Sequence, residues 1–178
     1  AVNNLAGVPA IVFGLVGLGF FVQFGGKQID RTLYGGSLQY GQPAILWAAL
    51  TLAVLTLPVV IVSVEEALQA VPQSYREASL ALGSTKSQAV FRVVLPHALP
   101  GVLTGAILAI SRAAGEVAPI LFVGAAYYLP YLPTKLNQQF MELGYHIFIL
   151  STQSPDVDAT KPLLYATVFV LLALTFAL

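Results

Sequence analysis

Long apolar runs constrain the fold of this chain more than any other feature. They cover residues 8–24, 44–64 and 98–126, and a fourth begins near Pro162 and is still apolar at the last residue. A helix needs about 20 apolar residues to cross the hydrocarbon core of a bilayer, with about 17 as the lower limit. The run over residues 8–24, which is polar only at Gln23, just reaches this length. We therefore expect four membrane-spanning helices.

The composition supports a membrane protein and excludes several other classes. Charged residues make up only 9% of the 178 residues, whereas soluble domains carry about a quarter. The net charge is zero, which argues against a nucleic-acid partner because such a partner requires a basic face. The chain has no cysteine, so disulfides and thiolate metal sites are excluded. We expect an all-α, polytopic transmembrane bundle in a lipid bilayer.

The two ends suggest a piece of a longer protein. Residue 1 is Ala1 rather than Met, and the last apolar run is not closed by a polar segment before Leu178. No charged segment followed by a short apolar core and a cleavage site is present near the beginning, so we expect no signal peptide. The prediction is a single transmembrane domain over residues 1–178, truncated at both ends.

Three connections separate the spans, and their charges do not orient the chain. They cover residues 25–43, 65–97 and 127–161, and four spans put the first and third on one side and the middle one on the other. Basic residues occur in similar numbers on the two sides: Arg76, Lys86 and Arg92 in the middle connection, against Lys27, Arg31, Lys135 and the span-edge Lys161. The positive-inside rule therefore gives no orientation. The tyrosines of 127–161 suit a headgroup belt.

The middle connection carries the signals of a short helix and a sharp turn. Pro72 suits the first turn of a helix, where its missing N–H costs nothing. Tyr75, Ala78 and Leu82 follow at helical spacing and predict a one-sided apolar stripe. Gly83 suits the left-handed position that ends such a helix.

A second short helix is expected directly after the turn. Thr85 and Gln88 have the spacing of a capping box, and we expect Pro96 to close this helix. These features favour a polar helix–turn–helix at the membrane surface, which could be a docking site for a partner or an ordinary amphipathic loop.

The same segment resembles the EAA motif of ABC importer permeases. It contains Glu77-Ala78-Ser79, then Gly83, and ends in Val93-Val94-Leu95-Pro96, with Ser79 in place of the second alanine and Val93 in place of isoleucine. The resemblance implies that residues 65–97 form a cytoplasmic loop that couples the chain to a separate ATPase. The residues that it assigns to this loop are Glu77, Ala78, Ser79, Gly83, Leu95 and Pro96.

Two further segments are similar to permeases of the phosphate type. Residues 3–15, which begin Asn3-Asn4, look like the start of a core helix, and the stretch from Arg112 through Gly115-Glu116 to Pro119 is similar to an Arg-x-x-Gly-Glu-x-Ala-Pro signature. The resemblance implies an A-type phosphate permease subunit with a type I-like fold and six spans, the first two of which are missing here. It also implies a second permease subunit and an extracytoplasmic phosphate-binding protein as partners.

Arg112 and Glu116 are the only charges within an expected span, four residues apart and therefore on one helical face. A charge at a helix centre costs about 2.5–3.5 kcal/mol on insertion scales, and such residues mark functional sites by default. The planar guanidinium of Arg112 suits a tetrahedral oxyanion, with Glu116 holding it and moderating its charge. The alternative is a buried ion pair that only fixes helix packing.

Glycines four residues apart predict close helix packing in the same run. Gly101 and Gly105 form a small-xxx-small pair, and Ser111 and Gly115 repeat the spacing. Small residues let helix backbones approach closely in membranes, so packing is the expected role of Gly101, Gly105 and Gly115.

No catalytic, cofactor or metal site is expected. His97 and His146 lack partners at a metal-binding spacing, and no phosphate-cradling Gly-Lys-Ser/Thr loop is present, so ATP should bind elsewhere. An intramembrane enzyme that uses Glu116 and His97 is disfavoured because nineteen positions separate them. On one helix this separation is about 28 Å.

The sequence thus favours a multi-pass permease subunit of an ATP-driven phosphate importer in the inner (plasma) membrane, which carries no enzymatic activity itself. Its binding protein would dock on residues 25–43 and 127–161, opposite the coupling loop. Two alternatives stay open. The cargo could be another oxyanion such as sulfate or molybdate, or the chain could be a structural membrane subunit without a solute path.

Overall fold

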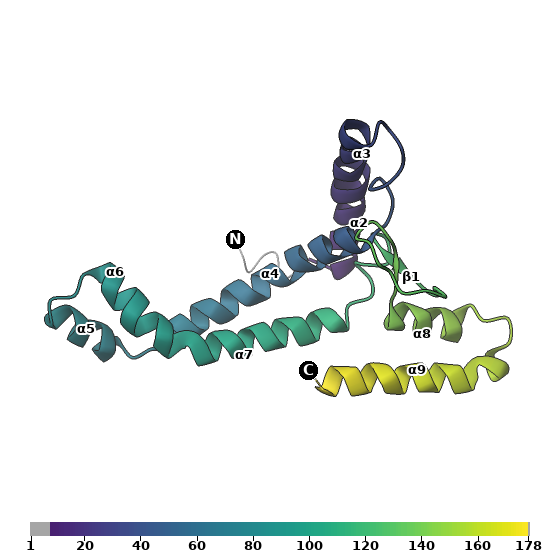
Figure 1. The fold of residues 1–178 in the computed structure, drawn as a ribbon. Coiled ribbons are helices and arrows are strands. Elements are labelled where there is room, and N and C mark those ends of the chain that lie inside the picture. The colour runs from purple at the N-terminus through teal and green to yellow at the C-terminus, as the bar shows by residue number, and fades with distance from the viewer. Residues whose placement is uncertain (1–7, 178) are drawn as a thin grey trace. The chain divides into compact units, whose positions relative to one another are not determined.

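The structure is a computed structural model that describes residues 8–177. The first residues of the 3–15 segment lie outside this range. The described chain divides into two compact units, one formed by residues 56–112 and the other by residues 8–55 and 113–177. Helices form most of both units (Figure 1).

Four helices are long and apolar enough to cross a membrane among the described residues, which confirms the predicted number. They cover Ala10–Leu33, Ile45–Gln69, Lys86–Ala114 and Val157–Ala177. The first is built from three consecutive elements, α2 (Ala10–Gly17), η1 (Leu18–Gly26) and α3 (Lys27–Leu33), and the second is α4 (Ile45–Gln69). Pro58 lies inside α4.

The third spanning helix begins earlier than predicted and runs through its first proline. α6 (Lys86–Ala89), η2 (Val90–Val94) and α7 (Leu95–Ala114) follow one another without a break. The prediction that Pro96 closes a separate helix was therefore wrong. Proline lacks a backbone N–H and its ring clashes with the carbonyl four residues back. Here the preceding turn is π-helical, and the Leu95 amide donates to the Val90 carbonyl, which is a local adjustment that lets a helix continue.

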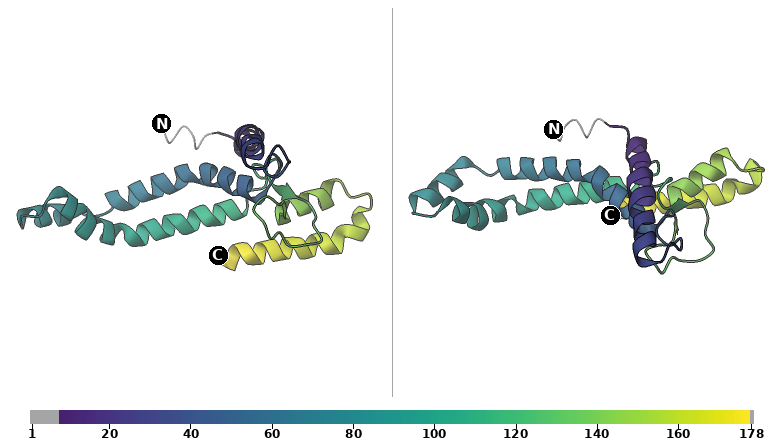
Figure 2. Two further views of the ribbon diagram at one scale, coloured as in Figure 1. Left: turned by 45° about the horizontal axis from the view of Figure 1, so that its top comes forward. Right: turned by 90° about the horizontal axis from the view of Figure 1, so that it is seen from above.

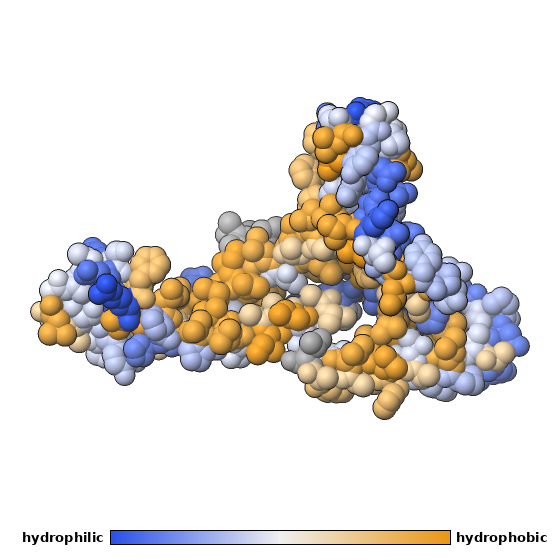
Figure 3. Space-filling view, viewed as in Figure 1, coloured by the Kyte–Doolittle hydropathy of each residue, from blue (hydrophilic) through white to orange (hydrophobic). Residues whose placement is uncertain are grey.

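In the first unit, α7 packs against the carboxyl-terminal part of α4 over small residues. A Cβ atom added to Gly105 would overlap the Cβ of Ser63, and one added to Gly101 would lie 2.8 Å from the Cβ of Ala67. Close backbone approach over small side chains is the packing mode that helices use within lipid. Hydrophobic residues cover most of the face of this helix pair that Figure 3 shows. Large apolar residues of α7 that are about half exposed include Leu99, Leu103 and Ile107.

The third span ends sooner than predicted, at Ala114 rather than near residue 126. The apolar stretch after it, residues 117–124, forms a series of turns instead of helix. Gly115 follows the last helical residue, a position that glycine often takes at helix ends. Pro119, which cannot continue a regular helix, comes shortly after.

This turn segment is part of the core of the second unit. Pro119 lies against Gly14 of α2, where an added Cβ would be 2.7 Å from the Pro119 carbonyl oxygen. Ile120 and Val123 are buried together with residues of the first two spans. The buried members of this core are Val22, Ala44, Trp47, Ala48, Ile120, Val123 and Ala125. Burial within the protein is the condition under which a non-helical segment is tolerated at membrane depth.

The long third connection contains regular structure that the sequence analysis did not predict. Two-residue strands, β1 (Ala125–Ala126) and β2 (Phe140–Met141), pair in parallel. They are followed by an apolar helix, α8 (Leu143–Thr152), which packs against α9 (Val157–Ala177). The views in Figure 2 show α8 and α9 side by side.

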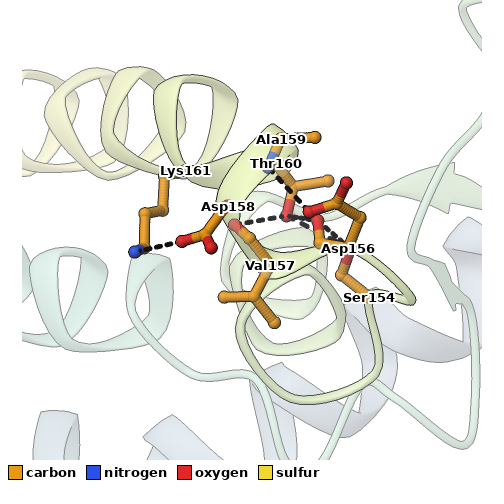
Figure 4. Close-up of polar contacts among 7 residues, drawn as sticks. All are labelled: Ser154, Asp156, Val157, Asp158, Ala159, Thr160 and Lys161. Atoms are coloured by element: carbon orange, nitrogen blue, oxygen red, sulfur yellow. Dashed lines mark hydrogen bonds and ion pairs between the residues drawn. The ribbon is translucent and has the colours of Figure 1, made fainter.

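α9 begins at Val157, before the predicted start near Pro162. The Asp156 carboxylate accepts a hydrogen bond of 3.0 Å from the Ala159 amide (Figure 4). A side-chain acceptor of this kind satisfies one of the free amides of the first turn, and Pro162 is then tolerated close to the helix start. The apolar run alone misses this polar first turn.

Candidate functional site: the α5–α6 hairpin

A helical hairpin connects α4 to α7 in the first unit, where the sequence predicts it. Its first helix, α5 (Gln73–Ala81), begins directly after Pro72 and ends before Gly83. Gly83 has a φ of +85°, the left-handed conformation that the sequence predicts. Its amide donates to the Leu80 carbonyl at 3.0 Å. Glycine adopts this conformation without the steric cost that other residues incur.

The second helix of the hairpin starts with the predicted capping box. The Gln88 amide donates to the Thr85 hydroxyl oxygen at 3.3 Å, and the Thr85 amide donates to the Gln88 side-chain oxygen at 2.9 Å. Both bonds satisfy amides that lack a helical partner. The direction in which α6 leaves the turn is therefore fixed locally.

Ser79 and Ser84 connect the two sides of the turn. Their hydroxyl oxygens lie 2.7 Å apart, and the Ser84 hydroxyl also donates to the Ser79 carbonyl at 2.7 Å. The serine that replaces an alanine of the EAA motif thus has a hydrogen-bonding partner across the turn.

Two contacts tie α5 to the ends of the membrane helices. The Tyr75 ring stacks on the His97 imidazole of α7, with ring centroids 4.9 Å apart and planes inclined by 29°. The Arg76 guanidinium donates to the Leu68 carbonyl near the end of α4, at 2.6 Å. A cation suits this position because the carbonyl end of a helix carries partial negative charge.

The outer face of the hairpin is open. No residue of α5 is buried, and Glu77 and Ala78 are exposed. Leu82, at the turn, is 90% exposed, and Phe91 is 67% exposed. Figure 3 shows hydrophilic and hydrophobic residues side by side over α5 and α6.

Leu95 and Pro96, which the resemblance also assigns to the coupling loop, lie where η2 passes into α7. Both are exposed, and they belong to the membrane helix rather than to the turn of the hairpin. The structure therefore separates them from Glu77, Ala78, Ser79 and Gly83. Their coupling role stays a prediction.

Arg112 and Glu116 do not share a continuous helix, so the prediction of one helical face was wrong. Arg112 is exposed and lies in the last turn of α7, where a cation is favoured by the helix dipole. Glu116 is half-buried and follows the end of α7 at Ala114. Neither residue is at the centre of a span, and their role in a solute path stays a prediction.

The three glycines predicted to pack helices have different positions. Gly101 and Gly105 lie against Ala67 and Ser63 of α4. Gly115 follows the last residue of α7 and is exposed, so it takes part in the end of the helix.

The sequence analysis missed Asp30, which organises the connection between α3 and α4. This carboxylate is buried and accepts three backbone hydrogen bonds, from Gln39 at 3.0 Å and from Tyr40 and Gly41 at 2.7 Å each. The Tyr40 carbonyl in turn accepts from the Trp47 indole at 2.7 Å. The signal in the sequence that could have indicated this role is a single acidic residue shortly after the first apolar run.

The amino terminus of α4 is held by backbone carbonyls from a distant part of the second unit. The Ala44 amide donates to Val123 at 2.8 Å, and the next two amides donate to Gln138 at 2.8 Å and to Leu136 at 3.1 Å. These bonds satisfy amides that a helix leaves free at its start. They join the start of the second span to the end of the third apolar run and to the third connection.

The four apolar helices and the polar hairpin between the second and third define a polytopic integral membrane protein. The chain matches the family of binding-protein-dependent transport system inner membrane components over residues 2–178, and it belongs to this family. The predicted resemblance to ABC importer permeases is thereby confirmed. The members of this family are components of transport systems.

Relatives with curated names support the same assignment. The chain is 36% identical over 172 residues to the probable ABC transporter permease protein YqgI of Bacillus subtilis, covering 89% of this chain and 53% of that protein. It is 42% identical over 120 residues to the phosphate transport system permease protein PstA 1 of Mycobacterium tuberculosis, and this match covers 67% of this chain and 35% of that protein. A probable phosphate transport system permease protein PstA of Methanocaldococcus jannaschii is 37% identical over 118 residues, and this match covers 66% of this chain and 41% of that protein.

The chain spans about half the length of the first of these relatives and less of the other two. No solved structure matches it significantly. The predicted similarity to phosphate-type permeases is confirmed by the names of these relatives.

Proposed function

We propose that this chain is the core of a permease subunit of an ATP-driven importer for inorganic phosphate in the inner (plasma) membrane. A second permease subunit completes the solute path, a separate ATPase supplies the energy, and an extracytoplasmic binding protein delivers phosphate. Two relatives that are phosphate transport system permeases by name support this cargo.

The open hairpin is the observation that carries the proposal. Its turn is fixed by Gly83 and by the Ser79–Ser84 hydrogen bonds, while Leu82 and Glu77 face outward. The base is attached to the membrane helices through the Tyr75–His97 stack. A rigid hairpin with an exposed apolar residue at its turn can transmit a movement of the ATPase to α4 and α7. Residues 65–97 are therefore proposed to be cytoplasmic.

Arg112 is proposed as a contact of the anion on its path, with Glu116 moderating its charge. The guanidinium supplies a planar set of donors that fits a phosphate oxygen pair. Its position at the end of α7 places it at one end of the span. A solute path must bind its ion weakly enough to release it, and a carboxylate four residues later in the sequence would serve that purpose.

Cross-linking tests the docking of the hairpin. The 178 residues contain no cysteine, so Leu82→Cys, in a full-length subunit from which any cysteine outside these residues has been removed, reports on one position. We expect a short bifunctional maleimide to join it to a single cysteine on the ATPase surface. Leu132→Cys is the matched control, since Leu132 is 87% exposed and lies in the third connection. Equal cross-linking from both positions, or none from position 82, would contradict the proposal.

A further inference from the structure

A polar hollow of about 270 Å³ lies in the second unit, between the first and third connections. It is lined by Gln42, Pro43, Tyr131, Asn137, Gln138 and Gln139. Side-chain amides dominate this lining, and none of the lining residues carries a charge. The sequence predicts that both connections lie on the side of the membrane opposite residues 65–97, so the proposed orientation makes the hollow extracytoplasmic.

The floor of the hollow is fixed by the start of α4. The Gln138 carbonyl accepts from the Ile45 amide at 2.8 Å, and the Gln138 side-chain oxygen accepts from the amides of Thr134 and Lys135 at 2.8 and 3.1 Å. These bonds hold residues 134–138 in one conformation against a membrane helix. Hydrogen bonds therefore hold the segments that form the hollow in place.

Hydrogen bonds also join its two walls. The Asn137 side-chain amide donates to the Gln39 side-chain oxygen at 3.0 Å, and the Gln42 side chain donates to the Gln39 carbonyl at 3.3 Å. The Gln39 backbone is held in turn by the buried Asp30 carboxylate. The Asp30 carboxylate thus binds backbone amides of the protein itself, and it holds the Gln39 side of the hollow in place.

Two groups on the lining are available for a partner. Within residues 8–177, no hydrogen bond joins the Gln139 side chain or the Tyr131 hydroxyl to another residue, and both residues are exposed. An amide offers a donor and an acceptor together, and a tyrosine hydroxyl does the same. This combination matches peptide groups and neutral polar side chains. Cationic donors such as guanidinium groups strengthen the binding of an oxyanion, and the lining has none.

We infer that this hollow is the place where the extracytoplasmic binding protein inserts an uncharged, hydrogen-bonding loop. The inference rests on the proposed function and adds the site of docking and its chemistry. Family membership implies a binding protein as a partner, and the hollow is a preformed polar recess on the side where that protein must arrive. Because the contacts are between neutral groups, docking through them is insensitive to salt, whereas contacts between exposed charges are screened.

The test measures binding of the purified binding protein to the full-length transporter in nanodiscs, at about 0.05 M and about 0.5 M NaCl. We expect Gln139→Ala and Tyr131→Phe each to weaken binding about three- to tenfold, the usual effect of losing one hydrogen bond. The wild-type affinity should change less than about twofold between the two salt concentrations. Gln23→Ala is the matched control, because Gln23 is exposed on η1, lies outside both connections and does not line the hollow.

Three results would overturn the inference. One is unchanged binding by both hollow variants, and another is a loss of wild-type binding at high salt. The third is saturable binding of free phosphate that Gln139→Ala abolishes, which would make the hollow an anion site. Uptake of phosphate by the wild-type transporter is measured in parallel. If uptake and docking are normal while the variants have no effect, only this inference fails. If the wild type neither takes up phosphate nor binds the binding protein, the proposed function fails with it.

Discussion

The Ser84 hydroxyl lies 2.7 Å from the Ser79 hydroxyl and 2.7 Å from the Ser79 carbonyl oxygen, across the glycine turn of the α5–α6 hairpin. Ser79 is the position at which this chain departs from the alanine of the EAA motif. The additional hydroxyl of Ser79 therefore has a hydrogen-bonding partner, Ser84, five residues later. The pair holds the turn that exposes Leu82.

This geometry predicts unequal effects of two alanine substitutions. Ser84→Ala removes both hydrogen bonds and Ser79→Ala only one, at about 1 kcal/mol each. Hydrogen exchange at the Gly83 amide, which is bonded to Leu80, should become faster in both variants and most in Ser84→Ala. Ser87→Ala is the control, since within the described chain the Ser87 side chain makes no hydrogen bond and is exposed. Equal exchange in all three variants would contradict the role of the pair.

Gly105 is predicted to be the most sensitive glycine of the α4–α7 contact. An alanine there would overlap Ser63, whereas at Gly19 an added Cβ meets nothing within 4 Å. We expect Gly105→Ala to lower the free energy of unfolding by about 1–3 kcal/mol, the usual cost of overpacking. Gly19→Ala should be neutral or slightly stabilising, because alanine favours helix more than glycine does. Thermal unfolding of the full-length protein in nanodiscs distinguishes the two, and similar melting temperatures would refute the packing.

Asp30 is predicted to stabilise the connection between α3 and α4. Asp30→Asn replaces one acceptor oxygen by an NH₂ group that faces backbone donors, at a cost of about 1.5–3 kcal/mol for a charged hydrogen bond. The exposed Asp158, which forms an ion pair with Lys161, provides the control Asp158→Asn, for which we expect less than about 1 kcal/mol. Thermal unfolding of both variants measures the difference. Proteolysis of the loop around Gly35 should also accelerate in Asp30→Asn alone.

Much of this fold follows from the sequence because its strongest signals are local. Hydropathy gives four spans, and the capping box of Thr85 and Gln88 and the left-handed Gly83 are found where their residue types require them. Each of these features depends on residues within a few positions of one another. The family resemblance likewise rests on short motifs.

The errors arose where distant residues decide the structure. Residues 117–124 are apolar enough for a helix, but they form turns that are buried against Gly14 and the start of α4. Pro96 was expected to end a helix, but a π-helical turn before it accommodates the ring. Asp30 resembles any solvated acid in the sequence, and its three amide partners become apparent only when the loop folds back over it.

Arg112→Gln is predicted to lower phosphate uptake by at least about tenfold while the complex still assembles, because glutamine keeps the approximate length but loses the charged donor fork. Arg112→Lys is the matched variant, because it keeps the positive charge and removes only the planar donor fork, and we expect it to retain more uptake than Arg112→Gln. Uptake of labelled phosphate by cells that lack their own importer is compared with the amount of assembled complex. Equal uptake by wild type and Arg112→Gln would contradict a contact between Arg112 and the anion and would indicate a structural role at the end of α7.

The most direct test of the account is ATP-dependent uptake of labelled phosphate into proteoliposomes that contain the full-length subunit and its partner subunits, with the binding protein supplied outside. We predict uptake that requires both ATP and the binding protein, and that unlabelled phosphate, but not sulfate or molybdate, abolishes. Absence of phosphate uptake by a transporter that hydrolyses ATP, or equal competition by sulfate or molybdate, would contradict the assignment of phosphate as the cargo.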